Sequence, residues 1–172
     1  MGSVFTLESA WRPPAPVARV WPVLADPRFT WPDWWPGLTA STTHSVVGPD
    51  GLAAPGTWAR LRVRSPLGYA LRFRLDLAQT TAPSDGEPGL ARLDVSGDLA
   101  GKAEVTVSGV SAGSAGKNSA GESTTEVRLV WQVSPVPAWF RAASSIAPGP
   151  LAWAHARVMR AGERGLAARL RG

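Results

Sequence analysis

The sequence contains no cysteine, and among its 172 residues there are only two histidines, one tyrosine and two methionines. Without thiols the chain forms no disulfide framework, and zinc sites or nucleophiles built on cysteine are excluded. The absence of cysteine fits a reducing compartment. The two histidines, His44 and His155, lie far apart in the sequence, so we expect no metal site and predict no cofactor.

Several motifs that carry catalysis are also missing. The chain has no phosphate-binding loop, no dinucleotide-binding glycine pattern, no nucleophile elbow, and no paired carboxylates where a pocket is expected. The N-terminus lacks a basic start followed by an apolar run, and no uninterrupted apolar stretch is long enough to span a bilayer. We therefore expect a cytoplasmic protein without an integral membrane segment, with residues 1–172 forming a single domain.

The charge balance is basic but unclustered. Lysine and arginine number 18 against 13 acidic residues, which gives a formal net charge of +5. A basic excess can indicate nucleic acid or an anionic membrane as a partner. Here the arginines are scattered among aspartates and glutamates without a nucleic-acid-binding motif, so we favour solvated outer faces and predict no nucleic-acid partner.

What the sequence does contain is enough apolar material for a core. Hydrophobic residues make up 44% of the chain and nine residues are tryptophan, which excludes a disordered chain. Alternation of apolar and polar residues predicts a series of strands. These cover residues 4–11, 57–65, 69–80, 90–98, 102–109 and 124–133. The stretch 38–47 is only weakly patterned and is rich in Thr and Ser, and we expect a further strand there.

Two predicted hairpins fix strand registers. A turn at 66–68 sets Arg62 opposite Arg72 and Arg60 opposite Arg74, and we expect Arg74 to be compensated by Asp98 or Ser96. A three-residue turn at 99–101, with Gly101 in its left-handed position, sets Lys102 opposite Asp98 and makes a small-residue spot of Gly97 and Ala103 on the inner face. Residues 110–123, rich in Gly, Ser and Ala, are predicted to form a long hairpin loop.

Helical patterns occur after the first predicted strand and again after the last one. Short helices are predicted within 17–24, which contains Pro22, within 26–36, and at 136–146. A long helix is predicted over 150–171 because apolar residues recur there every three or four positions. They are Leu151, His155, Val158, Met159, Gly162, Leu166 and Leu170. Such a helix needs a large apolar surface to pack on.

This order indicates an α+β fold: a strand, two short helices, six hairpin-linked strands and a long C-terminal helix. The same order, with loose motifs at 16–26, 34–37, 97–101 and 153–166, resembles the START-like superfamily, and within it the polyketide cyclase/dehydrase-type (SRPBCC) branch. The resemblance covers almost the whole chain. It implies the helix-grip fold, in which a seven-stranded curved antiparallel sheet wraps around the long helix and encloses an apolar cavity. Members of the family include binders, transfer proteins and enzymes, so the resemblance implies no reaction.

The stretch from Trp31 to Gly37 concentrates aromatic surface, with Trp31, Trp34 and Trp35 close together. One interpretation is a lid or rim that stacks on an aromatic ligand. The other is a plug that closes the open end of the sheet. Phe73 and Trp131, which point inward on their strands, are further candidates for contact with a ligand or for core packing.

His155 shares the inner face of the long helix with Met159, and both are candidate ligand-binding residues. His155 is also a weak candidate for a catalytic base. The alternative, which we favour, is a core histidine hydrogen-bonded to a strand carbonyl. Gly162 on the same face leaves room for a ligand or for a crossing strand.

Three functions remain open from the sequence. The first is the binding of a hydrophobic, aromatic or polyketide-like small molecule in a cavity between the sheet and the C-terminal helix, which needs no enzymatic activity. The alternative is a polyketide aromatase/cyclase in which His155, with Tyr69 or an inward arginine, polarises a ketone. The third is a protein-interaction or membrane-surface module that uses the basic outer face.

Overall fold

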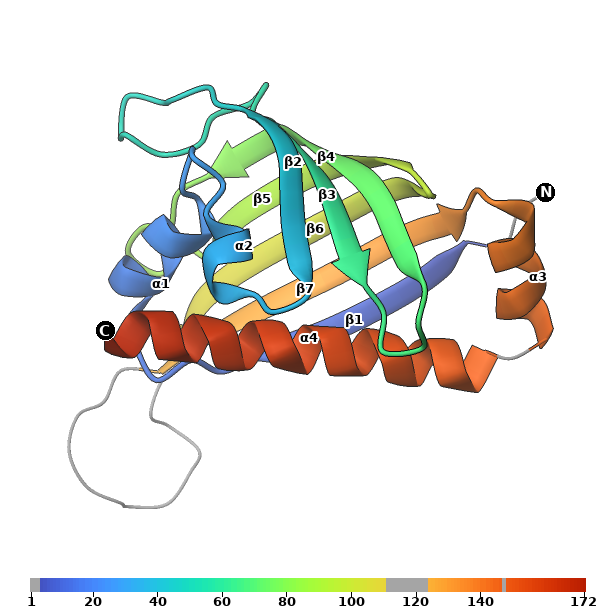
Figure 1. Cartoon of the computed structure of the whole chain (residues 1–172). Helices are drawn as coiled ribbons and strands as arrows, with labels where there is room; N and C mark the ends of the chain where they lie inside the picture. The colour runs from blue at the N-terminus through green and yellow to red at the C-terminus, as the bar shows by residue number, and fades with distance from the viewer. Residues whose placement is uncertain (1–3, 111–123, 147) are drawn as a thin grey trace, which may run out of the picture.

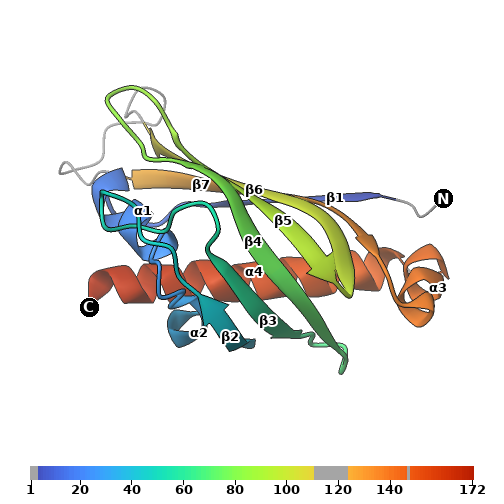
Figure 2. The same cartoon turned by 90° about the horizontal axis from the view of Figure 1, so that it is seen from above.

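The computed structural model describes residues 4–110, 124–146 and 148–172. A seven-stranded antiparallel sheet curves over one long C-terminal helix, α4, as Figures 1 and 2 show from two directions. The strands are β1 (Phe5–Trp11), β2 (Leu38–His44), β3 (Trp58–Arg64), β4 (Ala70–Thr81), β5 (Gly89–Gly97), β6 (Leu99–Val110) and β7 (Thr124–Pro135). The helices are α1 (Val17–Leu24), α2 (Trp31–Trp34), α3 (Ala138–Ile146) and α4 (Pro148–Arg171). The predicted α+β helix-grip architecture is confirmed.

The sheet order is β1-β7-β6-β5-β4-β3-β2, so β1 lies beside the last strand and β2 forms the far edge. Six of the neighbouring pairs are antiparallel, which is the pattern of hairpins joined in sequence with β1 added at one side. Apolar residues at alternate positions point to the concave face and are buried there, for example Leu75, Val107 and Val127. This concave face is what α4 covers.

The register of β3 with β4 is as predicted, with Arg62 opposite Arg72 and Arg60 opposite Arg74. The predicted partner of Arg74 was wrong. Its guanidinium pairs with Asp76, two residues along the same strand, with Nε donating to Oδ2 at 2.8 Å, and it also stands 4.1 Å above the Trp58 ring. Residues two apart on a strand point to the same side, which makes Asp76 the nearer carboxylate.

The β5–β6 hairpin differs from the prediction by four residues. Asp94 faces Lys102 and Leu93 faces Ala103, so Lys102 does not lie opposite Asp98 and Gly97 does not pair with Ala103. Asp98 is held by β4 instead, because its N–H donates to Arg72 O and its Oδ2 accepts from Arg72 N, both at 2.8 Å. Since a shift by an even number keeps each side chain on its face, Ala103 and Val105 are still buried.

Two glycines make this hairpin possible. Gly97 has φ +118°, and a Cβ there would lie 2.8 Å from Arg72 O. Gly101 sits within β6 and not in a turn, and a Cβ there would lie 2.0 Å from Gln132 O. Only glycine allows such close approach of neighbouring backbones.

The helices cover the sheet unequally. α4 runs lengthwise beneath the concave face, α1 and α2 lie at the end where α4 finishes, and α3 lies at the end where α4 begins (Figure 1). Among the helices that the structure describes, none is long and apolar enough to cross a membrane. The predicted loop at 110–123 falls almost wholly outside the described residues.

Candidate functional site

A cavity of about 280 Å³ lies between the concave face of the sheet and α4. Its wall is formed by β1, β2, β3, β4, β6 and β7 on the sheet side and by α2, α3 and α4 on the other. Most of its lining is aliphatic or aromatic, and its polar lining side chains are Ser65, Tyr69, Ser144 and His155 together with the indoles of Trp31, Trp35 and Trp131. A hollow of this composition can desolvate an apolar molecule while offering it a few hydrogen bonds.

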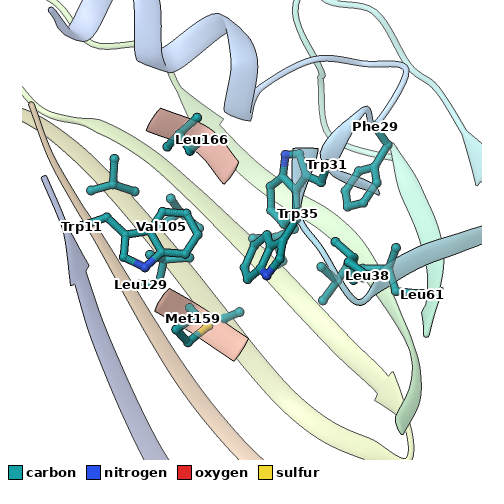
Figure 3. Packing of buried hydrophobic residues seen from close by; sticks show 14 of the residues in the cluster. Trp11, Phe29, Trp31, Trp35, Leu38, Leu61, Val105, Leu129, Met159 and Leu166 are labelled. Atoms are coloured by element: carbon teal, nitrogen blue, oxygen red, sulfur yellow. The ribbon is translucent and has the colours of Figure 1, made fainter. Parts of the chain in front are cut away.

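Tryptophans close the end of the cavity nearest α2, where Figure 3 shows Trp31 and Trp35 beside Trp11, Met159 and Leu166. The Trp11 and Trp35 rings meet edge to face with centroids 5.1 Å apart, and Trp34 stacks on Trp35 at 5.8 Å. Such aromatic pairs add to the stabilisation that comes from burying their surface. Trp31 and Trp35 line this end of the cavity, and Trp11 and Trp34 pack against Trp35. We call these four residues the tryptophan wall.

Hydrogen bonds fix two of these indoles. Trp35 Nε1 donates to Val158 O of α4 at 3.1 Å, and Trp31 Nε1 donates to Leu24 O at the end of α1 at 3.0 Å. The Trp35 ring lies against Gly162, where a Cβ would come within 2.5 Å of Cε2. The space at Gly162 is thus taken by Trp35, and the prediction that it admits a ligand or a strand was wrong.

The loop before α2 is held by Asp26. Its Oδ1 accepts the Arg28 amide hydrogen at 2.9 Å and its Oδ2 accepts from Thr30 Oγ1 at 3.1 Å. Burial raises the pKa of Asp26, but the hydrogen bonds from Arg28 and Thr30 outweigh this effect and leave the pKa below its ordinary value. This bracing supports Phe29, which adopts φ +55° and packs on Trp31 with ring centroids 4.7 Å apart.

Within the described residues, five buried polar side-chain atoms have no hydrogen-bond partner. Two of them, Trp131 Nε1 and His155 Nε2, belong to residues that line the cavity. The other three are the indole nitrogens of Trp11, Trp21 and Trp34, which do not line it. Because an unsatisfied buried polar atom costs free energy, a hydrogen-bond partner for either of these two atoms would be favourable.

His155 is the titratable group of this wall. Burial lowers the pKa of its imidazole, because the charged form loses solvation. The ring is therefore neutral at pH 7 and can donate or accept one hydrogen bond at Nε2. The interpretation that we favoured from the sequence, a bond to a strand carbonyl, is not found at Nε2.

The structure places six of the seven sequence-predicted ligand-binding residues on the cavity wall: Trp31, Trp35, Phe73, Trp131, His155 and Met159. Trp34 is the exception, because its ring is buried against Trp35 and it does not line the cavity. Whether any of the seven binds a ligand stays a prediction.

Sequence reasoning missed much of the wall. Phe140 and Ser144 of α3 line the cavity, and their spacing of four residues on a short amphipathic helix is a signal that could have found them. Ala154, which is buried on α4, was missed because alanine is too common in this helix to mark a face. Tyr69 was considered only within the cyclase alternative.

No protein-family model matches the chain, and no curated protein matches it in sequence. Solved structures do match. The Zhui aromatase/cyclase from a Streptomyces species is 15% identical, with a TM-score of 0.58 over 98% of this chain and 94% of that one. The KanY protein is 14% identical, with a TM-score of 0.58 over 99% of both chains.

A third match is a point mutant of norcoclaurine synthase from Thalictrum flavum in complex with a transition-state analogue. It is 13% identical, with a TM-score of 0.53 over 100% of this chain and 99% of that one. At these identities the matches establish the fold alone. The chain has the helix-grip fold of START-like, polyketide cyclase-type proteins, as its sequence indicated.

Proposed function

We propose that this chain, taken as one domain over residues 1–172, binds a hydrophobic, aromatic or polyketide-like small molecule in the cavity between the sheet and α4. The observation that carries the proposal is the cavity itself, an almost wholly apolar hollow with two unused hydrogen-bonding groups on its wall. Binding follows from burial, since each methylene removed from water contributes about 0.8 kcal/mol.

The cavity also limits the size and the polar groups of the ligand. At about 280 Å³ it lies just below the usual range for ligand pockets, roughly 300–1,000 Å³, which favours a compact ring system over a long chain. The Trp131 N–H requires an acceptor, and a neutral His155 can pair with a hydroxyl or a carbonyl. An aromatic skeleton that carries a carbonyl or hydroxyl group meets all three conditions.

The test begins with native mass spectrometry of freshly purified protein, to detect a small lipophilic molecule that co-purifies. Affinity for the apolar fluorescent probe N-phenyl-1-naphthylamine is then measured by its emission. We expect Val158→Phe, which fills the cavity from α4, to abolish probe binding, because Val158 lines the wall. The matched control is Val47→Phe, at an exposed position outside the cavity. Equal binding by wild type and Val158→Phe would overturn the proposal.

A second candidate function is an aromatase/cyclase, and a specific observation favours it. His155 lines the cavity, its buried Nε2 has no hydrogen-bond partner, and its lowered pKa keeps the ring in the neutral form that a general base needs at pH 7. Tyr69 lines the same cavity and brings a phenolic hydroxyl that can polarise a ketone. The Zhui aromatase/cyclase shares the fold.

The two candidates predict different behaviour of His155→Ala. A cyclase loses turnover of a poly-β-ketone thioester mimic but keeps its affinity, whereas a binder shows no turnover to lose. Turnover that is unchanged by His155→Ala would remove this histidine from any catalytic role.

A further inference from the structure

One end of the molecule exposes apolar side chains that a folded chain normally buries. Ile146, the last residue of α3, is 83% exposed, and Trp139 of the same helix is 51% exposed. We call five such residues the apolar rim: Leu67, Val136, Trp139, Ile146 and Trp153. They come from the β3–β4 turn, the β7–α3 junction, α3 and the first half of α4. Contiguous exposed apolar surface of this kind marks an interaction site.

The rim follows the cavity wall. Leu67 lies between Ser65 and Tyr69, Val136 follows Pro135, and Trp139 precedes Phe140, all of which line the cavity. Ile146 comes two residues after the lining residue Ser144, and Trp153 stands between Ala152 and Ala154. At each of these places an exposed apolar side chain lies within two residues of one that lines the cavity, so the rim adjoins the cavity at the end formed by α3 and the start of α4, away from α2 (Figure 1).

Side-chain contacts join the separate elements of the rim. The Tyr69 ring, just after the β3–β4 turn, lies 5.7 Å from the Trp139 ring and 5.8 Å from the Phe140 ring of α3. Figure 1 shows α3 beside the start of α4, and the two helices are in contact. The elements that carry the rim are therefore in contact with one another at this end of the molecule.

Positive charge accompanies each part of the rim. Arg141 Nη1 donates to the Val136 carbonyl at 2.7 Å, and the Arg157 guanidinium lies 5.8 Å from the Trp153 ring. Arg64 is exposed three residues before Leu67. Residues 60–75 and 135–162, which build the rim, contain no aspartate or glutamate. One carboxylate adjoins the rim: Asp98, whose carbonyl accepts the Val136 amide hydrogen at 2.9 Å and whose Oδ2 accepts the Arg72 amide hydrogen at 2.8 Å.

We infer that this end of the molecule docks on an anionic lipid bilayer, so that an apolar ligand passes between the membrane and the cavity without crossing bulk water. The transfer of a ligand rests on the proposed binding function, whereas the docking on the bilayer does not depend on it. Tryptophans lie at the level of lipid headgroups, aliphatic side chains enter the acyl boundary, and arginines meet anionic headgroups.

The composition of the rim favours a bilayer over nucleic acid. A nucleic-acid surface uses cations and stacking aromatics to contact phosphates and bases. Exposed aliphatic side chains such as Ile146, Leu67 and Val136 contribute nothing to such contacts. A bilayer uses both kinds of residue at once.

The test is co-sedimentation of the full chain with vesicles of phosphatidylcholine alone or with about 30% phosphatidylglycerol, at low and at high salt. We expect binding to the anionic vesicles that weakens with salt. Arg141→Glu with Arg157→Glu should weaken it by at least about 25-fold, since each cation near the surface contributes about fivefold. Trp139→Ser with Ile146→Ser should weaken it by about tenfold or more through loss of apolar insertion.

Matched controls lie outside the rim. Val47→Ser removes an exposed apolar residue and Arg171→Glu reverses an exposed charge at the other end of α4, and both should bind vesicles within about twofold of wild type. Far-UV circular dichroism and a cooperative urea-unfolding transition verify that every variant folds. A variant that keeps its fold but loses vesicle binding supports the inference.

Three results would overturn it. These are no binding of wild type to anionic vesicles at low salt, rim variants that bind like the controls, and binding to a single-stranded DNA oligonucleotide that matches the vesicle affinity and is unaffected by the Trp139 and Ile146 changes. Failure of the proposed function looks different, because probe binding would then be absent while vesicle binding remained.

Discussion

At the scale of single residues, His155 makes the stability of the fold depend on pH. Its imidazole is mostly buried with Nε2 unpaired, and burial lowers its pKa below the ordinary value of 6.5. In the unfolded chain the ring takes up a proton as the pH falls through 6.5, while in the folded chain it stays neutral to a lower pH. Proton uptake by the unfolded state then favours unfolding, so this residue reduces stability as the pH falls below 6.5.

The first prediction concerns His155→Leu. Wild type should lose stability between pH 7.5 and the lowered pKa of His155, and the variant should lack this part of the loss because leucine does not titrate. Urea unfolding at a series of pH values measures it. Parallel pH profiles for the two proteins would contradict the prediction.

Trp131 provides a second prediction at this scale. If its unused Nε1–H bonds a ligand oxygen, Trp131→Phe should weaken binding of 1-naphthol by roughly two- to tenfold, the value of one net hydrogen bond. Binding of naphthalene, which has no oxygen, should change little beyond what the smaller ring costs. Displacement of N-phenyl-1-naphthylamine measures both affinities. An equal loss for the two compounds would show that the indole contributes only apolar surface.

At the scale of elements, the contact of α2 with α4 depends on two glycines. Gly162 receives the Trp35 ring, and Gly165 receives the Trp34 backbone so closely that an added Cβ would lie 1.7 Å from Trp34 O. A carbonyl cannot move aside as a side-chain tip can. The tryptophan wall is therefore positioned by the absence of side chains on α4 as much as by the indoles themselves.

The third prediction follows from this contact. Gly165→Ala should destabilise the fold by about 3 kcal/mol or more, because α2 must separate from α4 to relieve the clash. Gly149→Ala is the matched control in the same helix. A Cβ at residue 149 meets nothing within 4 Å, and this position lies in the first helical turn directly before Pro150, so alanine should change the stability by less than about 0.5 kcal/mol. Thermal unfolding compares them, and a Gly165→Ala protein as stable as wild type would contradict the close approach in the structure.

The sequence was sufficient for the elements and the face that each one buries. Apolar alternation identified every strand except β2, whose Thr- and Ser-rich stretch was only weakly patterned, and a turn at Pro66 to Gly68 fixed the β3–β4 register. The β5–β6 register was not predictable in the same way. Gly97 and Gly101 both resemble turn residues, and only the bonds between Asp98 and Arg72 on another strand decide where the hairpin turns.

The candidate site shows the same division. Residues such as Phe73 and Met159 follow from strand parity and helix spacing, because both place a side chain on the concave side. Which of three neighbouring tryptophans lines the cavity is decided by how α2 docks on α4, and this contact joins segments more than a hundred residues apart. The spacing of apolar residues within one segment carries no information about how two distant segments pack together.

At the scale of the whole molecule, the sheet and α4 enclose space that side chains leave unfilled. Protein interiors are normally packed to the density of organic crystals, so a void of about 280 Å³ sacrifices contacts that tighter packing would provide. The hydrogen-bonded strands of the sheet and the tryptophan wall, which is bonded to α4 through Trp35, keep α4 at a distance from the concave face. A ligand that occupies it should therefore stabilise the fold by a free energy that rises with the logarithm of the ligand concentration, once that concentration exceeds the dissociation constant.

The last prediction uses pressure to test whether this space is a dry hollow. Pressure favours the state of smaller volume, and an unfolding chain gives up its internal voids. Wild type should unfold with a volume change near the large end of the range from about −20 to −100 mL/mol. Val158→Phe, or saturation with N-phenyl-1-naphthylamine, should make the volume change smaller, because either one fills the cavity. High-pressure tryptophan fluorescence follows the transition, with Val47→Phe as the control that leaves the cavity unfilled. Identical volume changes in all four samples would mean that water already occupies the cavity, and burial of apolar surface in a dry site could then not be the driving force for binding.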